Sequence, residues 1–178
     1  MKNLTLENGK SVVIREARGS DATKLLEHVN TISSETDFLT FGQGEFIMSV
    51  EEEEKHLENT LRQNNAIFII AEIDEKIVGC LNFTAGSRPR VEHTGEFGVS
   101  VLKEYWGNGI GAELIKQLIK WCKQLGSIRK INLIVRDDNF SAIHVYKKLG
   151  FTQEGIITRN LQINGRFYDA LFMAYTID

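Results

Sequence analysis

The stretch that most constrains the fold is residues 95–112, Gly-Glu-Phe-Gly-Val-Ser-Val-Leu-Lys-Glu-Tyr-Trp-Gly-Asn-Gly-Ile-Gly-Ala. Its apolar residues Phe97, Val99 and Val101 alternate with polar or small ones, as in a strand with one buried face. From Ile110 onward, apolar residues recur at helical spacing and predict a helix with one apolar side. The chain therefore passes from a strand through a glycine-rich turn into a helix.

Three glycines, Gly107, Gly109 and Gly111, stand where this helix begins. The first turn of a helix exposes unpaired N–H groups and the positive end of the helix dipole, so it suits an anion such as a phosphate. The first hypothesis is therefore a phosphate-bearing cofactor at this turn. The alternative is that the glycines only permit a tight turn and close helix packing.

Composition limits the other functions open to the chain. With 178 residues, 42% of them hydrophobic and 25% charged, the chain is long enough for one domain with its own core, predicted over residues 1–178. A formal net charge of -3 gives no basic footprint for nucleic acid, so no nucleic-acid partner is expected.

Cysteine use and hydropathy indicate the compartment. Cys80 and Cys122 form no Cys-x-x-Cys pair, which favours a reduced protein without disulfides. We find no signal-peptide pattern and no run of the roughly 18 apolar residues that a membrane span needs, so a soluble, cytoplasmic protein is predicted. The four histidines show no metal-ligand spacing, and no metal is expected.

The remaining segments predict strands and helices in a fixed order. Strands are expected at residues 12–16, 66–73, 77–83, 96–101, 131–135, 153–163 and 167–177, and helices at about 20–30, 50–63, 110–125 and 140–149. Asn164-Gly165 is a strong turn signal for a terminal hairpin. The order is β-α-α-β-β-β-α-β-α-β-β, a mixed sheet with helices on its faces.

An acidic run, Glu51-Glu-Glu-Glu54, opens the second helix after a Ser49/Glu52 capping box. The simplest interpretation is a favourable first turn against the helix dipole and a solvated face. Residues 31–48 have no clean period, and their aromatic residues fit either plain covering of the core or a loop packed over a ligand.

Known phosphate loops give only a partial match. A Walker loop needs Lys and Ser or Thr after its last glycine, but Gly111 is followed by Ala112 and Glu113. The dinucleotide pattern fits literally as Gly107-x-Gly109-x-x-Ala112. Antiparallel strands are expected before it, however, and the acidic residue expected about 20 positions later is missing. A nicotinamide cofactor and a simple tight turn both stay open at this point.

A wider pattern adds the downstream run Asn139-x-x-Ala142-x-x-x-Tyr146-x-Lys148-x-Gly150-Phe151 to the strand 99–101 and the loop 106–111. In this order the three segments resemble the GCN5-related N-acetyltransferase (GNAT) family, and the resemblance extends over the whole chain. Tyr105-Trp106-Gly107 and Gly165-x-x-x-Asp169-x-x-x-Met173 are similar to the branch with ribosomal-protein N-terminal and spermidine acetyltransferases.

The resemblance implies an α/β (α+β) fold, with a mixed, mainly antiparallel central sheet of about seven strands flanked by about four helices. The motif core would cover residues 94–151. The resemblance also implies acetyl-CoA as co-substrate, with its pyrophosphate on the backbone of the glycine turn. The cofactor-binding residues expected from it are Val99, Ser100, Val101, Gly107, Asn108, Gly109, Ile110, Gly111, Ala112, Asn139, Ala142, Tyr146 and Lys148. Asn139 is also expected to cap the short helix, which is compatible with contact with CoA, and the alternative for Lys148 is simple exposure to solvent. Trp106 departs from the family pattern, which has Gln or Arg there.

Acetyl transfer to an amine needs a base, an oxyanion donor and an acid. A lysine-like amine with a pKa of about 10.4 is neutral in roughly one molecule in two thousand at pH 7, so a base matters. We expect Glu96 to be that base, since the family often has a Glu there. The alternative for Glu96 is an exposed or ion-paired strand carboxylate. Backbone N–H groups of residues 99–101 would stabilise the oxyanion where neighbouring strands diverge. Tyr146 would protonate the leaving thiolate, and its alternative is a packed aromatic residue.

The function predicted is therefore an acetyl-CoA-dependent N-acetyltransferase that acts on a primary amine by direct transfer in a ternary complex. Neither cysteine supports a covalent intermediate. A non-catalytic acyl-CoA-binding module on the same fold is the alternative. The acceptor stays open among a peptide N-terminus, a polyamine and another small amine. It is expected near residues 31–48 and 156–168, where Glu35, Asp37 and Glu45 hint weakly at a cationic amine. A homodimer through a terminal strand is allowed by the family.

Overall fold

The computed structural model describes residues 2–6 and 9–178, which form eight strands and four α-helices. The strands are β1 (Lys2–Thr5), β2 (Ser11–Glu16), β3 (Ala66–Ile73), β4 (Lys76–Ala85), β5 (Thr94–Val101), β6 (Lys130–Arg136), β7 (Thr152–Ile163) and β8 (Arg166–Thr176). The helices are α1 (Ala22–Glu35), α2 (Val50–Arg62), α3 (Ile110–Leu125) and α4 (Phe140–Lys148).

All eight strands belong to one sheet, in the order β1-β2-β3-β4-β5-β6-β8-β7. Every neighbouring pair is antiparallel except β5 and β6, which are parallel. The mixed, mainly antiparallel sheet and its four helices confirm the predicted fold class. Because β5 follows a run of antiparallel strands, the sheet also lacks the parallel array that the dinucleotide pattern normally opens.

One strand was not predicted. The β1 segment, Lys-Asn-Leu-Thr, is short and polar, so it carries no alternating pattern of its own. It pairs with β2 at the edge of the sheet, Lys2 opposite Ile14, and the Lys2 ammonium also forms an ion pair with Glu113 on α3. Its strand conformation therefore depends on a neighbour, which a local pattern does not reveal.

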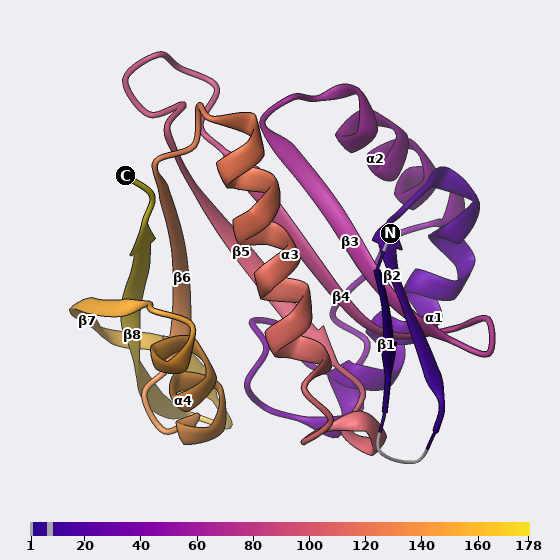
Figure 1. Ribbon diagram of the computed structural model, residues 1–178. Helices are drawn as coiled ribbons and strands as arrows, with labels where there is room; N and C mark the ends of the chain where they lie inside the picture. Colours follow the sequence, from indigo (N-terminus) through magenta and orange to yellow (C-terminus); the bar gives the residue numbers. More distant parts are fainter. Residues whose placement is uncertain (1, 7–8) are drawn as a thin grey trace.

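Helices cover the two faces of the sheet. One face carries α3 and α4, and the other carries α1 and α2 (Figure 1). The larger apolar core lies under α3 and includes Leu81, Phe83 and Leu114. The smaller core includes Leu25 of α1 and Leu57 of α2.

Capping residues in the sequence predicted where α2 begins, but the residue before α1 has another role. Ser49 Oγ accepts the N–H of Glu52, and Glu52 Oε2 accepts the N–H of Ser49, so the expected capping box is present. Asp21 precedes α1, but its carboxylate binds Arg15 and the N–H of Arg18 instead of the helix.

The solvated-face interpretation of the acidic run is wrong for one residue. Glu53 is only 4% exposed on the side of α2 that faces the sheet, and burial raises the pKa of its carboxyl group. The helical repeat turns Glu53 toward the sheet, while Glu51, Glu52 and Glu54 are exposed.

The feature that positions the candidate site is the short pairing of β5 with β6. The register pairs Thr94 with Lys130, Gly95 with Ile131 and Glu96 with Asn132, and then stops. Both strands continue beyond that point, and Figure 1 shows them running apart. We call residues 97–101 and 133–136 the splay.

Gly95, at the paired end of β5, has no room for a side chain. A Cβ built there would lie 2.4 Å from Phe83 Cζ and 2.6 Å from the Thr84 carbonyl oxygen. Gly95→Ala is therefore expected to destabilise the protein by about 3 kcal/mol through overpacking. Gly155→Ala on β7, where nothing lies within 4 Å, is the control and should stay within about 0.5 kcal/mol of wild type. Urea unfolding followed by circular dichroism measures both, and equal midpoints for the two variants would contradict the packing.

Candidate active site

The splay leaves backbone hydrogen-bonding groups of β5 without a strand partner. In an antiparallel ladder, alternate residues direct their N–H and C=O groups to opposite sides. The N–H of Leu102 donates to Val78 on β4 at 2.9 Å, so Ser100 and Gly98 face β4 as well. Val99 and Val101 consequently face β6, where the register has ended. Their N–H groups find no acceptor among the described residues.

The glycine turn follows directly after the splay. Gly107 and Gly109 have φ values of 78° and 76°, the left-handed region that side chains rarely adopt. Asn108 Nδ2 donates to the carbonyl oxygens of Tyr105 and Trp106 at 3.1 and 3.2 Å, so this predicted ligand residue uses its side chain to hold the turn.

Helix α3 begins at this turn with its first N–H groups free. The first helical bond is from Glu113 N–H to the Gly109 carbonyl, which leaves the N–H groups of residues 109–112 unpaired within the helix. The Ile110 side chain is buried in the core, so only its backbone is available to a ligand. A Cβ at Gly111 would lie 3.7 Å from Val101, which puts the helix start beside the end of β5.

The predicted residues on α4 do not share one side. Asn139 is the N-cap, as expected, and its Oδ1 accepts the N–H of Ala142 at 3.3 Å. Tyr146 lies seven residues after Asn139 and on the same side of the helix, whereas Lys148 is rotated by about 200° from Tyr146. Lys148 is exposed. Asn139 and Tyr146 therefore lie on one side of the helix and Lys148 lies on the other.

Tyr146 lies beside the splay in an aromatic cluster. Its ring centroid is 6.1 Å from that of Phe97 on β5 and 6.0 Å from that of Phe151. The side chain is only 8% exposed, and burial raises the pKa of its phenol to about 12. No described residue hydrogen-bonds to the hydroxyl. It therefore stays protonated at neutral pH and keeps its O–H free to donate.

Glu96 lies on the opposite face of the sheet. It alternates with Phe97, which packs against Tyr146, so its exposed carboxylate projects toward the face that carries α1 and α2. Its register partner Asn132 donates to Thr94 Oγ1 at 2.8 Å, and the buried Asn132 Oδ1 has no partner in the part of the chain that the structure describes. The two predicted catalytic side chains thus lie on the two faces of the sheet.

Ser100 also projects to the face of α1, away from the core that Val99 and Val101 join. The Ser100 hydroxyl lies 3.0 Å from Nε2 of His28 on α1 and 3.3 Å from Cys80 Sγ on β4. The His28 Nδ1–H donates to the Ile77 carbonyl at 3.2 Å, because a carbonyl only accepts. Nε2 of the neutral ring then accepts from Ser100. These hydrogen bonds fix β4 and β5 to α1 at the splay. They join residues far apart in the sequence, and no sequence pattern predicted them.

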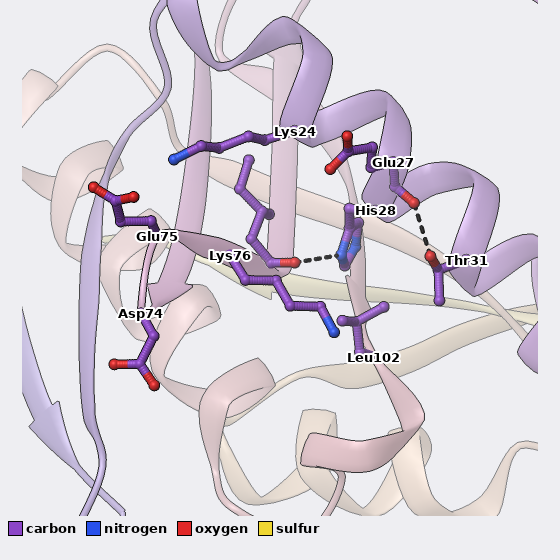
Figure 2. A pocket seen from close by; sticks show the side chains of 9 residues that line it. Lys24, Glu27, His28, Thr31, Asp74, Glu75, Lys76 and Leu102 are labelled. Carbon is purple, nitrogen blue, oxygen red and sulfur yellow. Dashed lines mark hydrogen bonds between the residues drawn. The ribbon is translucent and has the colours of Figure 1, made fainter.

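His28 also lines a pocket of about 280 Å³ between α1 and the β3–β4 turn. Figure 2 shows the imidazole at its base, with Lys24, Lys76, Asp74 and Glu75 around it. Its lining comes from α1, the β3–β4 turn, the start of β4 and Leu102, and it contains none of the predicted catalytic or cofactor-binding residues. The pocket meets the splay only through His28, which binds Ser100.

The loop after α1 is held against the terminal hairpin by Arg136, the last residue of β6. The guanidinium lies 4.4 Å from the ring centroid of Phe38 and 4.3 Å from that of Tyr168. It donates to both carboxylate oxygens of Asp138 and to the Asp37 carbonyl. The two segments expected to flank the acceptor are thus brought together. The sequence around Phe38, Thr-Asp-Phe-Leu-Thr, gave no sign of this stacking.

Two of the acidic residues in this region are already engaged. Glu35 Oε2 accepts the N–H of Lys103 at 2.8 Å, and Glu45 Oε2 accepts the N–H of Gly42 at 2.7 Å. Of the three residues that hinted at a cationic acceptor, Asp37 is the one whose carboxylate has no partner among the described residues.

Within residues 2–6 and 9–178, no group of three or more His, Cys, Asp or Glu side chains is arranged to hold a metal ion. No helix in the same ranges is long and apolar enough to cross a membrane.

His28 makes stability depend on pH. Burial lowers the pKa of its imidazole from 6.5 to about 4, so the folded state binds fewer protons than the unfolded state between these values. The contribution is complete above pH 6.5 and is lost as pH falls toward 4, by about 3 kcal/mol in total. His28→Gln is expected to flatten this part of the pH–stability curve, measured by urea unfolding at steps from pH 7.5 to 4. The exposed His144→Gln is the control, and an unchanged slope in His28→Gln would refute the assignment.

Comparison with known proteins gives consistent relatives. Residues 22–151 match the model of the acetyltransferase (GNAT) family. The chain is 36% identical over 106 residues to L-amino acid N-acetyltransferase AaaT of Escherichia coli (strain K12), covering 60% of this chain and 65% of that protein. It is 34% identical over 83 residues to spermidine N(1)-acetyltransferase of the same strain, covering 47% and 45%. These matches span less than two thirds of each relative.

The structural match is more extensive. The acetyltransferase of the GNAT family from Streptococcus pneumoniae superposes with a TM-score of 0.91 at 36% identity, covering 93% of this chain and 99% of that chain.

Proposed function

The chain belongs to the acetyltransferase (GNAT) family, and on this premise we propose that it is an acetyl-CoA-dependent N-acetyltransferase that acetylates a primary amine. The observation that carries the proposal is the splay itself. Its free N–H groups on Val99 and Val101 adjoin the unpaired N–H groups at the start of α3, with the free phenol of Tyr146 nearby.

Acetyl-CoA fits these groups as a co-substrate. Its pyrophosphate is an anion and suits the N–H groups of residues 109–112 at the positive end of the α3 dipole. Its amide-containing arm offers carbonyl acceptors and N–H donors, which match the unpaired backbone of Val99. Ser100 contributes no side chain to this arrangement, because its hydroxyl is engaged with His28.

The reaction is a direct transfer in a ternary complex. The amine nitrogen attacks the thioester carbonyl carbon, the C–N bond forms and the C–S bond breaks. The amine proton goes to Glu96, directly or through water, and the departing sulfur receives a proton or hydrogen bond from Tyr146. A backbone N–H at Val99 or Val101 stabilises the oxyanion between these steps. The placement of Glu96 and Tyr146 on opposite faces suits an acceptor and a thioester that approach from opposite sides.

The acceptor is proposed to bind on the face of α1 and α2. Glu96 and the buried Glu53 bring to this face two carboxylates that have no hydrogen-bond or ion-pair partner among the described residues, which favours a positively charged amine. The names of the two curated relatives specify an L-amino acid and spermidine for those proteins, and both are small amines. We therefore favour a small amine over a protein N-terminus.

The proposal extends to the setting of the enzyme. The outer edge of β7 ends the sheet, and a second copy of the chain pairing there would give a homodimer. We place the enzyme in the cytoplasm, where acetyl-CoA and reduced thiols are found.

A screen of free-CoA release tests the activity. Acetyl-CoA is offered with L-amino acids, spermidine, short peptides and aminoglycosides, and the free thiol is measured with a chromogenic disulfide. Release that depends on one amine class supports the enzyme. Tight acetyl-CoA binding by calorimetry with no release on any amine would instead favour the non-catalytic acyl-CoA-binding module.

Tyr146→Phe and Glu96→Gln are expected to lower kcat on the best amine by about 10²- to 10⁴-fold, because each removes a proton-transfer group. The calorimetric Kd for CoA should change less than about twofold, since neither group serves the pyrophosphate. Tyr175→Phe in the same aromatic cluster and the exposed Glu92→Gln are matched controls and should keep full turnover. Normal turnover in both Tyr146→Phe and Glu96→Gln would refute the roles of acid and base proposed for these residues.

A further inference from the structure

Trp106 stands where the family pattern has Gln or Arg, at the junction between the splay and the glycine turn. The residue is 48% exposed, which is high for so large an apolar side chain. The indole Nε1–H donates to the Val101 carbonyl oxygen at 2.6 Å. The side chain thus binds the end of β5 from the first residue of the turn.

This bond has a specific physical consequence. The Val101 carbonyl faces β6 beyond the last register pair, so it has no strand partner. A carbonyl without a strand partner needs water or another donor, and the indole supplies that donor at the protein surface. Val101 keeps its N–H free, while its carbonyl is already used.

Trp106 is itself held in place on both sides. The backbone N–H of Trp106 donates to the Lys103 carbonyl at 3.1 Å, and its backbone carbonyl accepts from Asn108 Nδ2 at 3.2 Å. The three hydrogen bonds therefore set the glycine turn at a defined position relative to the strand. Because the indole N–H is directed at Val101, the ring itself remains as an exposed apolar surface beside the turn.

We propose that Trp106 is a further cofactor-binding residue: it holds the Val101 carbonyl and presents its ring to the CoA chain between the pyrophosphate and the thioester. The polar side chain of the family pattern is thereby replaced by an aromatic contact. This inference rests on the proposed function, because it takes CoA as the ligand.

Tryptophan fluorescence provides a direct test, because the chain has only two tryptophans. Trp121 lies on α3 against Phe83, with ring centroids 6.0 Å apart, and Trp106→Phe, which leaves Trp121 as the one emitter, is the control. In Trp121→Phe, the remaining fluorescence comes from Trp106. Saturating CoA is expected to change this emission and to reduce its quenching by iodide at least twofold. Unchanged iodide quenching with CoA bound would overturn the contact.

Calorimetry of Trp106 variants with CoA separates the hydrogen bond from the ring. Trp106→Phe keeps a ring but loses the donor and should weaken CoA binding about three- to tenfold, the usual range for one hydrogen bond. Trp106→Ala should weaken it further, and Trp121→Phe should bind as wild type does. A merely structural role would lower the Tm of Trp106→Phe and leave its Kd within twofold of wild type, which would overturn the inference.

The two proposals fail differently. If wild-type protein gives no calorimetric signal with CoA or acetyl-CoA, the proposed function is refuted and this inference with it. If wild type binds CoA and Trp106→Phe binds equally well, only the role of Trp106 is refuted.

Discussion

The premature end of the β5–β6 ladder is the constraint on which the candidate site depends. Elsewhere in the sheet, neighbouring strands pair along most of their length, but here the register stops at Glu96 and Asn132. Backbone N–H and C=O groups taken out of water need partners, so strands that diverge must satisfy them in another way. Trp106 does this for the Val101 carbonyl. The N–H groups of Val99 and Val101 are left for a ligand with acceptors of its own.

The splay also explains why the site is divided between two faces. Residues on β5 alternate in direction, so Val99 and Val101 join the core below α3, while Glu96 and Ser100 project toward α1. On the α3 side, Tyr146 packs against Phe97. On the α1 side, His28 forms a hydrogen bond with Ser100. A reaction between two substrates at this point can therefore use a donor and an acceptor bound on opposite sides of one strand. The buried, neutral imidazole of His28 contributes by keeping β4, β5 and α1 in fixed relation.

Features encoded in neighbouring residues were predictable from the sequence. The strand, glycine turn and helix at residues 95–112, the Ser49/Glu52 capping box, the Asn139 cap and the Asn164-Gly165 hairpin all depend on local spacing, and the structure contains each. Strand β1 was missed because its ladder comes entirely from β2. The contacts of His28 with Ser100 and of Arg136 with Phe38 and Tyr168 join residues 72, 98 and 32 positions apart, respectively, so no local pattern reports them. The unbonded hydroxyl of Tyr146 and the hydrogen bond from the Trp106 indole to Val101 likewise became visible only in the folded structure.

The most direct measurement of the central claim is amide hydrogen exchange along β5, followed by NMR with and without CoA. The protection of these amides is expected to alternate along the strand. The N–H groups of Gly98 and Ser100 face β4 and should be protected in both states, whereas those of Val99 and Val101 should exchange rapidly in the free protein and become protected when CoA binds. Equal protection of all four amides without ligand, or no change at Val99 and Val101 with CoA bound, would contradict the assignment of the splay as the cofactor site.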